Sequence, residues 1–406
     1  MEDLIRASLD HCIKCTICET VCPVAQVTPL FPGPKYEGPQ AERFRLPSGS
    51  ADASVDYCSG CGLCTQVCPQ GVKIAEINSR ARAHFKAQKG VSVRDRILAR
   101  PGLTGRLGTP VAPLANRVMA NGTARRLMEK AVGVHHAAPV PVYAGHSFQR
   151  WARHHERHAS PRLDGRSVVY FHGCSVNWFE PDLGRMVVAV LEHNGVEVKM
   201  PRQDCCGLPL QSNGLFDAAR RALGRLARDL SAGSAGHAVV ASSTSCGVML
   251  KREGREILGL DDDETLRAVG ARTFDVCEYL LDLHGQGLLD TGFRPLPLTV
   301  IYHAACQQRG HSMGTPALEL LRLVPELEVI RSEADCCGMA GTYGLKKEKY
   351  DIGMAVGERL FEQVRRVGPD AVACDGETCR WQITKATGRA SVHPVELLFR
   401  AYGLEL

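Results

Sequence analysis

HCIKCTICETVCPV at residues 11–24 and YCSGCGLCTQVCPQ at residues 57–70 carry the pattern that decides the fold. Both stretches spell C-x2-C-x2-C-x3-C-P, so four cysteines and a proline recur at the same spacing. A [4Fe–4S] cubane offers four irons that each take one thiolate, and a tight loop with Cys at every third position reaches three of them. The two stretches therefore predict two [4Fe–4S] clusters, each with one more distant ligand.

The last cysteine of each run is expected to bind the cluster of the other run, as in two-cluster ferredoxins. The ligands predicted for the first cluster are Cys12, Cys15, Cys18 and Cys68, and those for the second are Cys58, Cys61, Cys64 and Cys22. Zinc is the rival ion, but structural zinc sites usually draw on two C-x2-C pairs separated by a longer insert. Here four cysteines fall within eleven residues, twice, which favours iron–sulfur clusters.

The residues around the two runs predict a small helical domain over residues 1–98. The insertion 24–57 is rich in Pro and Gly, which predicts an ordered loop rather than a strand. The Ala- and Arg-rich stretch 74–89 predicts a helix. The opening MEDLIRASLD lacks the apolar core of a signal peptide, so we expect the 18 cysteines of the chain to be kept reduced.

The second half of the chain is an internal duplication. The recurring segments are VVYFHGCSVN at 168–177 and TVIYHAACQQ at 299–308, CCGLP at 205–209 and CCGMA at 336–340, and SSTSC at 242–246 and DGETC at 375–379. Equivalent cysteines are 132, 131, 131 and 133 residues apart, as subtraction of their numbers shows. This constancy predicts two repeated domains, over 167–290 and 291–406.

Each repeat alternates strands with helices, which predicts a parallel α/β layer with the cysteines at the carboxyl ends of strands. The fold class is therefore mixed, with a helical two-cluster ferredoxin-type domain followed by two duplicated α/β cysteine-rich domains. Adjacent cysteines suit a metal cluster better than a mutual disulfide, which would be strained. The candidate ligands of further clusters are Cys174, Cys205, Cys206 and Cys246 in the first repeat, and Cys306, Cys336, Cys337 and Cys379 in the second.

A basic connector is predicted over residues 99–166. Between Ser79 and Arg166 there are seventeen Lys or Arg and four acids, a balance of +13, whereas the whole chain carries only +5. Two interpretations stay open: an amphipathic segment on a membrane surface, or a strap packed over the cluster domain. No stretch predicts a membrane span, and the basic segment is not accompanied by a nucleic-acid-binding module.

Taken together, the motifs resemble the iron–sulfur family that includes heterodisulfide reductase subunits, the glycolate oxidase iron–sulfur subunit and lactate-utilisation proteins. Within that family, HCIKCTICETVCPV, GPKYEGPQAERFRL, FHGCSVN, CCGMAGTYGLKKEKY and GETCRWQI are similar to segments of the C subunits of anaerobic glycerol-3-phosphate dehydrogenases. The similarity extends over nearly the whole chain.

The resemblance implies an electron-transfer subunit, with the substrate chemistry on a partner. A flavoprotein dehydrogenase partner would oxidise sn-glycerol 3-phosphate, and this chain would pass the electrons to the quinone pool. It would also help to hold the complex, as a peripheral protein, on the cytoplasmic side of the inner membrane. The residues agree in one respect, since no G-x-G-x-x-G dinucleotide fingerprint follows a strand here.

One departure from the family matters. Relatives that build a non-cubane cluster have C-x2-C at the end of each repeat, but here Ser243 and Gly376 take the first position of that pair. Four thiolates per repeat can hold an ordinary [4Fe–4S] cluster, and Cys374 is a candidate substitute in the second repeat. The alternatives are a redox-active thiol patch or a loop that contacts the quinone.

Two other functions stay open at this point. One is the iron–sulfur subunit of a lactate- or glycolate-oxidising complex, and the other is a thiol–disulfide enzyme similar to heterodisulfide reductase. His172 and His303, just before the leading cysteine of each repeat, either relay protons to a quinone or are satisfied by backbone carbonyls.

Overall fold

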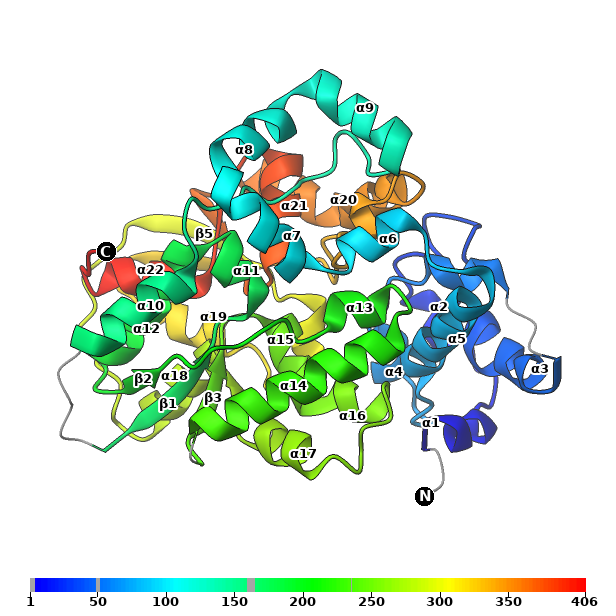
Figure 1. Cartoon of the computed structure of the whole chain (residues 1–406), viewed down its shortest axis with the longest axis horizontal. Helices are drawn as coiled ribbons and strands as arrows, with labels where there is room; N and C mark the ends of the chain where they lie inside the picture. Colours follow the sequence, from blue (N-terminus) through cyan, green and yellow to red (C-terminus); the bar gives the residue numbers. More distant parts are fainter. Residues whose placement is uncertain (1–3, 49–51, 159–164, 235) are drawn as a thin grey trace.

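The computed structural model describes residues 4–48, 52–158, 165–234 and 236–406. A helical N-terminal part lies beside two α/β layers, and a group of helices from the connector stands above them (Figure 1). This arrangement confirms the predicted fold class. We propose 1–98, 99–166, 167–290 and 291–406 as domain limits, although residues 1–3, 49–51 and 159–164 lie outside the described part of the chain.

The N-terminal part is built from short helices around the two cysteine runs. These are α1 (Leu4–Ala7), η1 (Ser8–His11), α2 (Ile17–Thr20), η2 (Tyr36–Gln40), α3 (Ala41–Ser48), η3 (Ala53–Tyr57), α4 (Leu63–Gln66) and α5 (Ile74–Lys89). The helix predicted over 74–89 is confirmed by α5, whose Ile74 and Ile77 are buried.

The prediction of a loop over 24–57 was wrong in part, because η2, α3 and η3 occupy much of it. The Pro- and Gly-rich composition appears as a kink at Gly38 inside η2 rather than as an irregular loop. The ion pair of Arg45 with Glu37, 2.7 Å apart, is almost completely buried and fastens α3 to η2. Composition alone gives no sign of this pairing.

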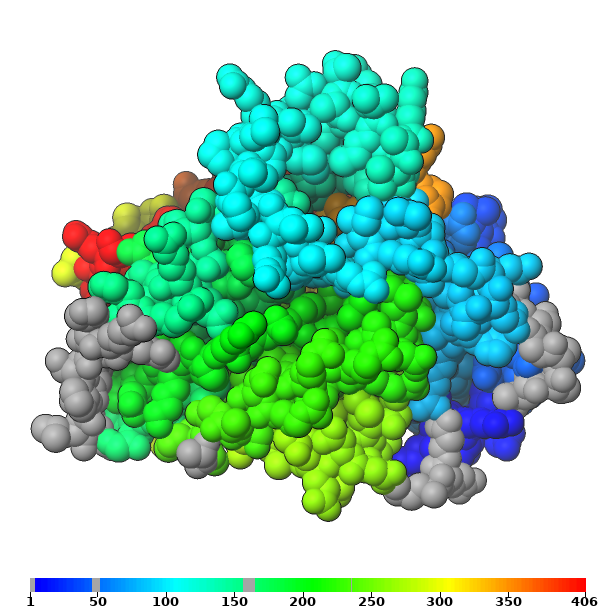
Figure 2. Space-filling model, viewed as in Figure 1, coloured from blue at the N-terminus to red at the C-terminus, as the bar shows by residue number. Residues whose placement is uncertain are grey.

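The connector is helical along most of its described length. Helix α6 (Val93–Leu98) directly precedes it, and its own helices are α7 (Pro101–Gly108), η4 (Thr109–Val111), α8 (Ala112–Ala120), α9 (Gly122–Val132) and α10 (Phe148–His158). Phe148 at the start of α10 is fully buried against the first repeat. In contrast, α8 and α9 form the protrusion at the top of the molecule (Figures 1 and 2).

None of the helices in the described residues has the length and apolar character needed to cross a membrane.

Each repeat contains one four-stranded parallel sheet. The first has the order β2-β1-β3-β4, with β1 (Ser167–Phe171), β2 (Glu197–Lys199), β3 (Ala238–Ala241) and β4 (Thr273–Asp275). The second has the order β6-β5-β7-β8, with β5 (Leu298–Tyr302), β6 (Leu327–Arg331), β7 (Ala371–Ala373) and β8 (Ser391–Val392). The matching strand orders agree with the duplication seen in the sequence.

Helices cover both sheets. Those of the first repeat are α11 (Gly173–Trp178), α12 (Pro181–His193), α13 (Leu208–Ser212), α14 (Phe216–Ser234), α15 (Thr244–Val248), η5 (Met249–Glu253), α16 (Gly254–Glu256), α17 (Glu264–Ala271) and α18 (Val276–Gly285). Those of the second are η6 (Cys306–His311), α19 (Pro316–Leu321), η7 (Tyr343–Leu345), α20 (Tyr350–Val367), α21 (Glu377–Thr387) and α22 (Pro394–Ala401).

The two repeats share one hydrophobic core. Helix α12 of the first repeat packs on α22 of the second, and α18 of the first packs on α19 of the second. Because α19 is the counterpart of α12 and α22 is the counterpart of α18, the two contacts are equivalent. Leu191, Leu280, Leu320 and Leu398 are buried in this common core. The repeats are therefore held face to face, as in a two-fold interface.

A partly buried carboxylate joins the N-terminal part to the second repeat. Lys349 Nζ lies 2.8 Å from Asp56 Oδ2, and Lys86 Nζ lies 3.2 Å from the same oxygen. Burial alone would raise the pKa of Asp56, but the charges of Lys349, Arg82, Lys86 and Lys346 hold it well below its ordinary value. The loop that precedes the second cysteine run is thus fixed against η7 and α20.

Removal of Lys349 should weaken this junction. We expect Lys349→Met to lower the free energy of unfolding by about 3 kcal/mol, because one partner of a buried ion pair is lost while Asp56 keeps Lys86 and Arg82. Denaturant unfolding of the purified protein measures this difference. The difference in free energy of unfolding between the wild type and Lys349→Met should shrink as the pH falls below about 4. Asp56 is then protonated, first in the unfolded and then in the folded state, and the stability that comes from its lowered pKa is lost.

The matched control is Lys347→Met. Lys347 is 58% exposed and lies 3.8 Å from Glu129, and the loss of such a surface pair should change stability by about 0–1 kcal/mol. Equal losses for the two variants would contradict the role assigned to Asp56.

Candidate metal centres and the cavity between them

The structure brings Cys12, Cys15, Cys18 and Cys68 together around one small hollow. Burial raises the pKa of Cys18 to about 11, and the charges of Glu19, Cys12 and Cys68 add to the increase. Cys68 therefore lies with the first run although it belongs to the second.

Cys22 of the first run lies in turn with the cysteines of the second run. Burial raises its pKa to about 12, and the charges of Cys58 and Cys61 raise it further, so its neighbours belong to the second run. The pKa of Cys64 lies well above its ordinary value because of burial and the charges of Cys61, Cys58 and Cys22. The two groups of four thus have the membership that the sequence predicts for the ligands.

Both runs follow the same unusual backbone path. Lys14 and Thr16 in the first run have φ of 61° and 68°, and Gly60 and Gly62 at the matching places have 70° and 77°. Only glycine adopts this left-handed region without steric cost. The alternation of ordinary and left-handed residues coils each loop tightly, which lets consecutive cysteines face a common centre.

The fit of these residues to [4Fe–4S] clusters rests on their chemistry. All described cysteines are free thiols, and each group presents four sulfurs. Amide groups also approach the sulfurs: the N–H of Ala25 donates to Cys22 Sγ at 3.5 Å. Donors of this kind favour the thiolate form that iron requires.

In the first repeat the four candidate cysteines form a continuous chain of contacts. Cys174 lies just after β1, the Cys205–Cys206 pair follows β2, and Cys246 follows β3 in α15. The sulfurs of Cys174 and Cys205 are 3.7 Å apart. The pKa of Cys205 lies well below its ordinary value because Cys174 and Cys206 donate hydrogen bonds to its sulfur. Cys206 in turn contacts Cys246.

The second repeat has the same chain of contacts. Cys306 is hydrogen-bonded to Cys336, and Cys337 lies between Cys336 and Cys379. These two neighbours donate to Cys337, which lowers its pKa to about 6. One thiolate among several thiols is a donor set suited to a soft metal centre.

The positions of the missing fifth cysteines are filled differently in the two repeats. Ser243 turns to the other repeat and donates to Glu377 Oε2 at 3.0 Å. A Cβ added at Gly376 would lie 3.2 Å from Cys379 Sγ, so this position has little room for a side chain. Cys374 is fully buried and hydrogen-bonded to Cys379, which makes it an extra thiol in the second repeat only.

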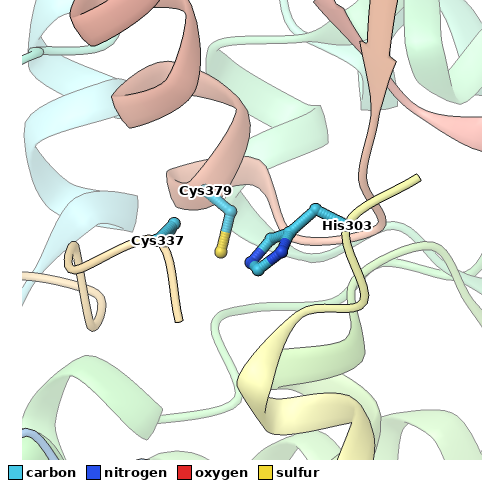
Figure 3. A group of neighbouring side chains, drawn as sticks. All are labelled: His303, Cys337 and Cys379. Atoms are coloured by element: carbon cyan, nitrogen blue, oxygen red, sulfur yellow. The ribbon is translucent and has the colours of Figure 1, made fainter. Parts of the chain in front are cut away.

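The two histidines before the leading cysteines have different surroundings. His172 Nδ1 is paired with the carbonyl oxygen of Gly173 at 2.8 Å, whereas its Nε2 is buried without a hydrogen-bond partner among the described residues. His303 lies instead within the second cysteine group, with ligand atoms of His303, Cys337 and Cys379 all within 4.8 Å of one another (Figure 3). Sequence reasoning did not single out His303 as a candidate ligand, because it treated His172 as the equivalent residue.

A cavity of about 450 Å³ lies where all parts of the chain meet. Cysteines of both repeats line it, together with the loop 59–62 of the second run and residues of the connector. The aromatic side chains of Tyr143, Phe179 and Trp381 are among the lining groups. The cavity is therefore in contact with both cysteine-rich sites and is mostly apolar.

The second cysteine run also lies near the second repeat. The charge of Cys306 raises the pKa of Cys61, and the charge of Cys61 raises the pKa of Cys336. The ion pair of Asp56 with Lys349 holds these two groups in place. The N-terminal thiols and the second cysteine-rich site are thus neighbours in space, although about 245 residues separate Cys61 from Cys306, as subtraction shows.

Comparison with known proteins gives the same division of the chain. Residues 8–72 match the family model described as a 4Fe-4S dicluster domain. Residues 168–251 and 300–384 each match the model described as a cysteine-rich domain. Together the fold and these sites define an iron–sulfur protein with a ferredoxin-type domain and two cysteine-rich domains.

Curated relatives narrow this class. The chain is 38% identical over 405 residues to the C subunit of anaerobic glycerol-3-phosphate dehydrogenase from Escherichia coli (strain K12), and the match covers 97% of this chain and 98% of that one. Lactate utilization protein A of Geobacillus thermodenitrificans is 29% identical over 227 residues, 55% of this chain and 92% of that one. The chain belongs to the family formed by the C subunits of anaerobic glycerol-3-phosphate dehydrogenases, so the resemblance seen in the sequence is confirmed.

The exchange of Cys22 and Cys68 can be tested by spectroscopy. We expect Cys22→Ser to perturb the same cluster as Cys61→Ser, because their thiols belong to one group, and to leave the cluster perturbed by Cys15→Ser intact. Electron paramagnetic resonance of the reduced variants, with iron analysis, compares them, and each variant can lose up to about four irons.

Cys277→Ala is the control for the loss of a buried thiol, since Cys277 is fully buried but belongs to neither ferredoxin-type group. The electron paramagnetic resonance signals of its two ferredoxin-type clusters should equal those of the wild type. A Cys22→Ser spectrum that matched Cys15→Ser would show that each run binds its own cluster.

Proposed function

We propose that this chain is the iron–sulfur electron-transfer subunit of a membrane-associated anaerobic glycerol-3-phosphate dehydrogenase. The chain accepts electrons from a flavoprotein partner and passes them to quinone. The observation that carries this proposal is the alignment with the Escherichia coli relative over 97% of the chain, together with a spatial sequence of thiol groups that ends at an apolar cavity.

The first two centres are assigned to the ferredoxin-type domain. Cys12, Cys15, Cys18 and Cys68 hold one [4Fe–4S] cluster, and Cys22, Cys58, Cys61 and Cys64 hold the other. Bound there, such clusters supply one-electron transfer at potentials set by hydrogen bonds and exposure. The closeness of Cys61 to Cys306 and Cys336 supports transfer from the second group to the second repeat.

One or two further clusters are assigned to the repeats. Their ligands are Cys174, Cys205, Cys206 and Cys246 in the first repeat, and Cys306, Cys336, Cys337 and Cys379 in the second. Three observations support this assignment: each set is contiguous, each contains a thiol whose pKa is lowered by its neighbours, and each borders the cavity.

The cavity is proposed as the place where quinone is reduced. Its mostly apolar lining, with aromatic side chains such as Phe179 and Trp381, suits a flat and largely apolar ring. Connector residues including Met119, Met128 and Val134 form part of its wall. A quinone that leaves a bilayer would reach the cysteine-rich sites beside the same helices that face the membrane.

The connector is proposed to hold the complex on the cytoplasmic side of the inner membrane. Many apolar side chains in and just before it are exposed, namely Val93, Ile97, Leu103, Leu107, Val111, Leu114, Val118 and Leu127. Basic residues such as Arg117 and Arg126 lie among them. Apolar groups flanked by positive charge favour a surface of anionic lipid.

The substrate is assigned to the partner subunit. A flavoprotein there would take two electrons from sn-glycerol 3-phosphate to give dihydroxyacetone phosphate, and this chain would accept those electrons singly. A complex that oxidises lactate or glycolate is the second candidate, favoured by the 29% identity to lactate utilization protein A. A thiol–disulfide enzyme is the third, favoured by the free thiols that border the cavity.

Reconstitution with a flavoprotein subunit of an anaerobic glycerol-3-phosphate dehydrogenase tests the proposal. We expect sn-glycerol 3-phosphate to reduce a soluble quinone analogue only when both proteins are present, with lactate and glycolate inactive. Quinone reduction driven by lactate or glycolate would establish the second candidate. Reduction of a disulfide substrate in place of quinone would establish the third.

Membrane attachment can be tested separately. Replacement of Leu107, Leu114 and Leu127 by Gln should release the protein from vesicles that contain anionic lipid, with a loss of binding of about tenfold or more, because each buried apolar side chain contributes about 1.5–3 kcal/mol. Vesicle flotation measures the bound fraction. Iron content should stay unchanged.

The control variant replaces Leu4, Leu30 and Leu406 by Gln. These residues are 79%, 50% and 50% exposed and lie outside the connector. Their replacement should leave vesicle binding intact, whereas release by the control, or retention of the connector variant, would refute the proposed anchor.

A further inference from the structure

We infer that the metal centre of the second repeat has a histidine ligand, the Nε2 atom of His303, in place of one of its four candidate cysteines. This inference rests on the proposed function, because it presupposes a cluster in that repeat. It assigns mixed nitrogen and sulfur ligation to the second repeat and sulfur ligation to the first.

The position of His303 is the first observation. The residue directly follows β5, its side chain is fully buried, and its Nε2 has no hydrogen-bond partner among the described residues. Figure 3 shows the imidazole ring beside the sulfur of Cys379, and the ligand atoms of His303, Cys337 and Cys379 all lie within 4.8 Å of one another. A buried nitrogen without a partner costs free energy unless something binds it.

The second nitrogen of the ring is oriented by a serine. His303 Nδ1 lies 3.2 Å from Ser332 Oγ, and this oxygen also accepts the N–H of Ala334 at 3.1 Å. With Nδ1 protonated and donating to Ser332, the lone pair of Nε2 faces the cysteines. Histidines that bind metals commonly have their other nitrogen held in this way.

The first repeat provides an internal comparison, in which Tyr170 is the equivalent of Tyr302. The hydroxyl of Tyr170 is hydrogen-bonded to Ser242, and that of Tyr302 to Asp375. These two partners stand at the same place, four residues before the last cysteine of their repeat. The residue equivalent to His303 is therefore the one after Tyr170, which is Phe171 and not His172.

Phe171 is the matching residue of the first repeat. It is buried in one hydrophobic cluster with Cys206 and Cys246, the counterparts of Cys337 and Cys379. A buried aromatic ring thus occupies this place in both repeats, but only the second ring carries a nitrogen. Because phenylalanine fills this place in the first repeat, the fold does not need a polar ring there.

The side chain of His172, the residue after Phe171, contacts other groups. Its Nδ1 pairs with the carbonyl oxygen of Gly173, and its ring lies 5.0 Å from that of Phe148. The Nε2 of His172 is also buried without a partner among the described residues, so His303 is distinguished by the closeness of its ring to Cys337 and Cys379.

A neutral imidazole leaves a cluster less negative than the thiolate that it replaces would. Replacement of cysteines by histidines raises the reduction potential of iron–sulfur centres. We therefore expect the centre of the second repeat to have the higher potential of the two repeats. Electrons would collect at the repeat whose cysteines lie near Cys61.

The test is pulsed electron paramagnetic resonance of the reduced full-length protein, labelled with ¹⁵N only at histidine. We expect a strong ¹⁵N coupling of the kind given by a directly bound imidazole. The coupling should disappear in His303→Phe, which inserts the residue of the first repeat and should therefore fold, as thermal unfolding can verify. It should persist in His172→Phe, the matched control.

A second variant keeps the test informative if the cluster is lost from His303→Phe. His303→Cys offers a thiolate at the same place, so it should retain iron, lack the ¹⁵N coupling and have a lower reduction potential than the wild type. Retained iron without any change of coupling or potential in both His303 variants would overturn the inference.

Iron analysis separates this inference from the proposed function. A wild type with more than about eight irons, the content of two four-iron clusters, but without histidine coupling would overturn the histidine ligand alone. A wild type with about eight irons, unchanged by Cys337→Ser, would show that the second repeat holds no cluster, and both proposals for that repeat would fail. Zinc without sulfide at the second repeat would likewise overturn both.

Discussion

The partly buried carboxylate of Asp56 is the contact on which the arrangement of the thiol groups depends. It lies two residues before the second cysteine run and is held by Lys349 of the second repeat and by Lys86 of α5. A buried charge that loses a partner is costly, so the loop cannot move away from the second repeat without a large loss of free energy. The closeness of Cys61 to Cys306 and Cys336 follows from this single junction.

The duplicated half shows how one fold carries two different sites. The strand orders match, and the reciprocal packing of α12 on α22 and of α18 on α19 keeps both sites on one cavity. Side chains at equivalent places nevertheless differ: Phe171 corresponds to His303. The backbone therefore preserves the geometry, while single substitutions around each site set its chemistry.

Features that depend on spacing could be predicted from the sequence. The two cysteine runs, the constant offsets of the repeats and helix α5 all follow local rules. The helices within 24–57 were missed because the ion pair of Glu37 with Arg45 stabilises them against their composition. His303 was missed because His172 lies one residue away from the equivalent position, and the burial and missing partner of a ring nitrogen become visible only in three dimensions.

The left-handed residues of the two runs have a consequence for biogenesis. Gly60 and Gly62 adopt their positive φ freely, whereas Lys14 and Thr16 adopt theirs at a cost of about 1–2 kcal/mol each. Without metal, the first loop gains free energy by relaxing, whereas the second has no such strain to release. The two sites should therefore fill in order during maturation, the glycine-containing one first, and the last iron to be inserted should also be the first to be lost under iron limitation.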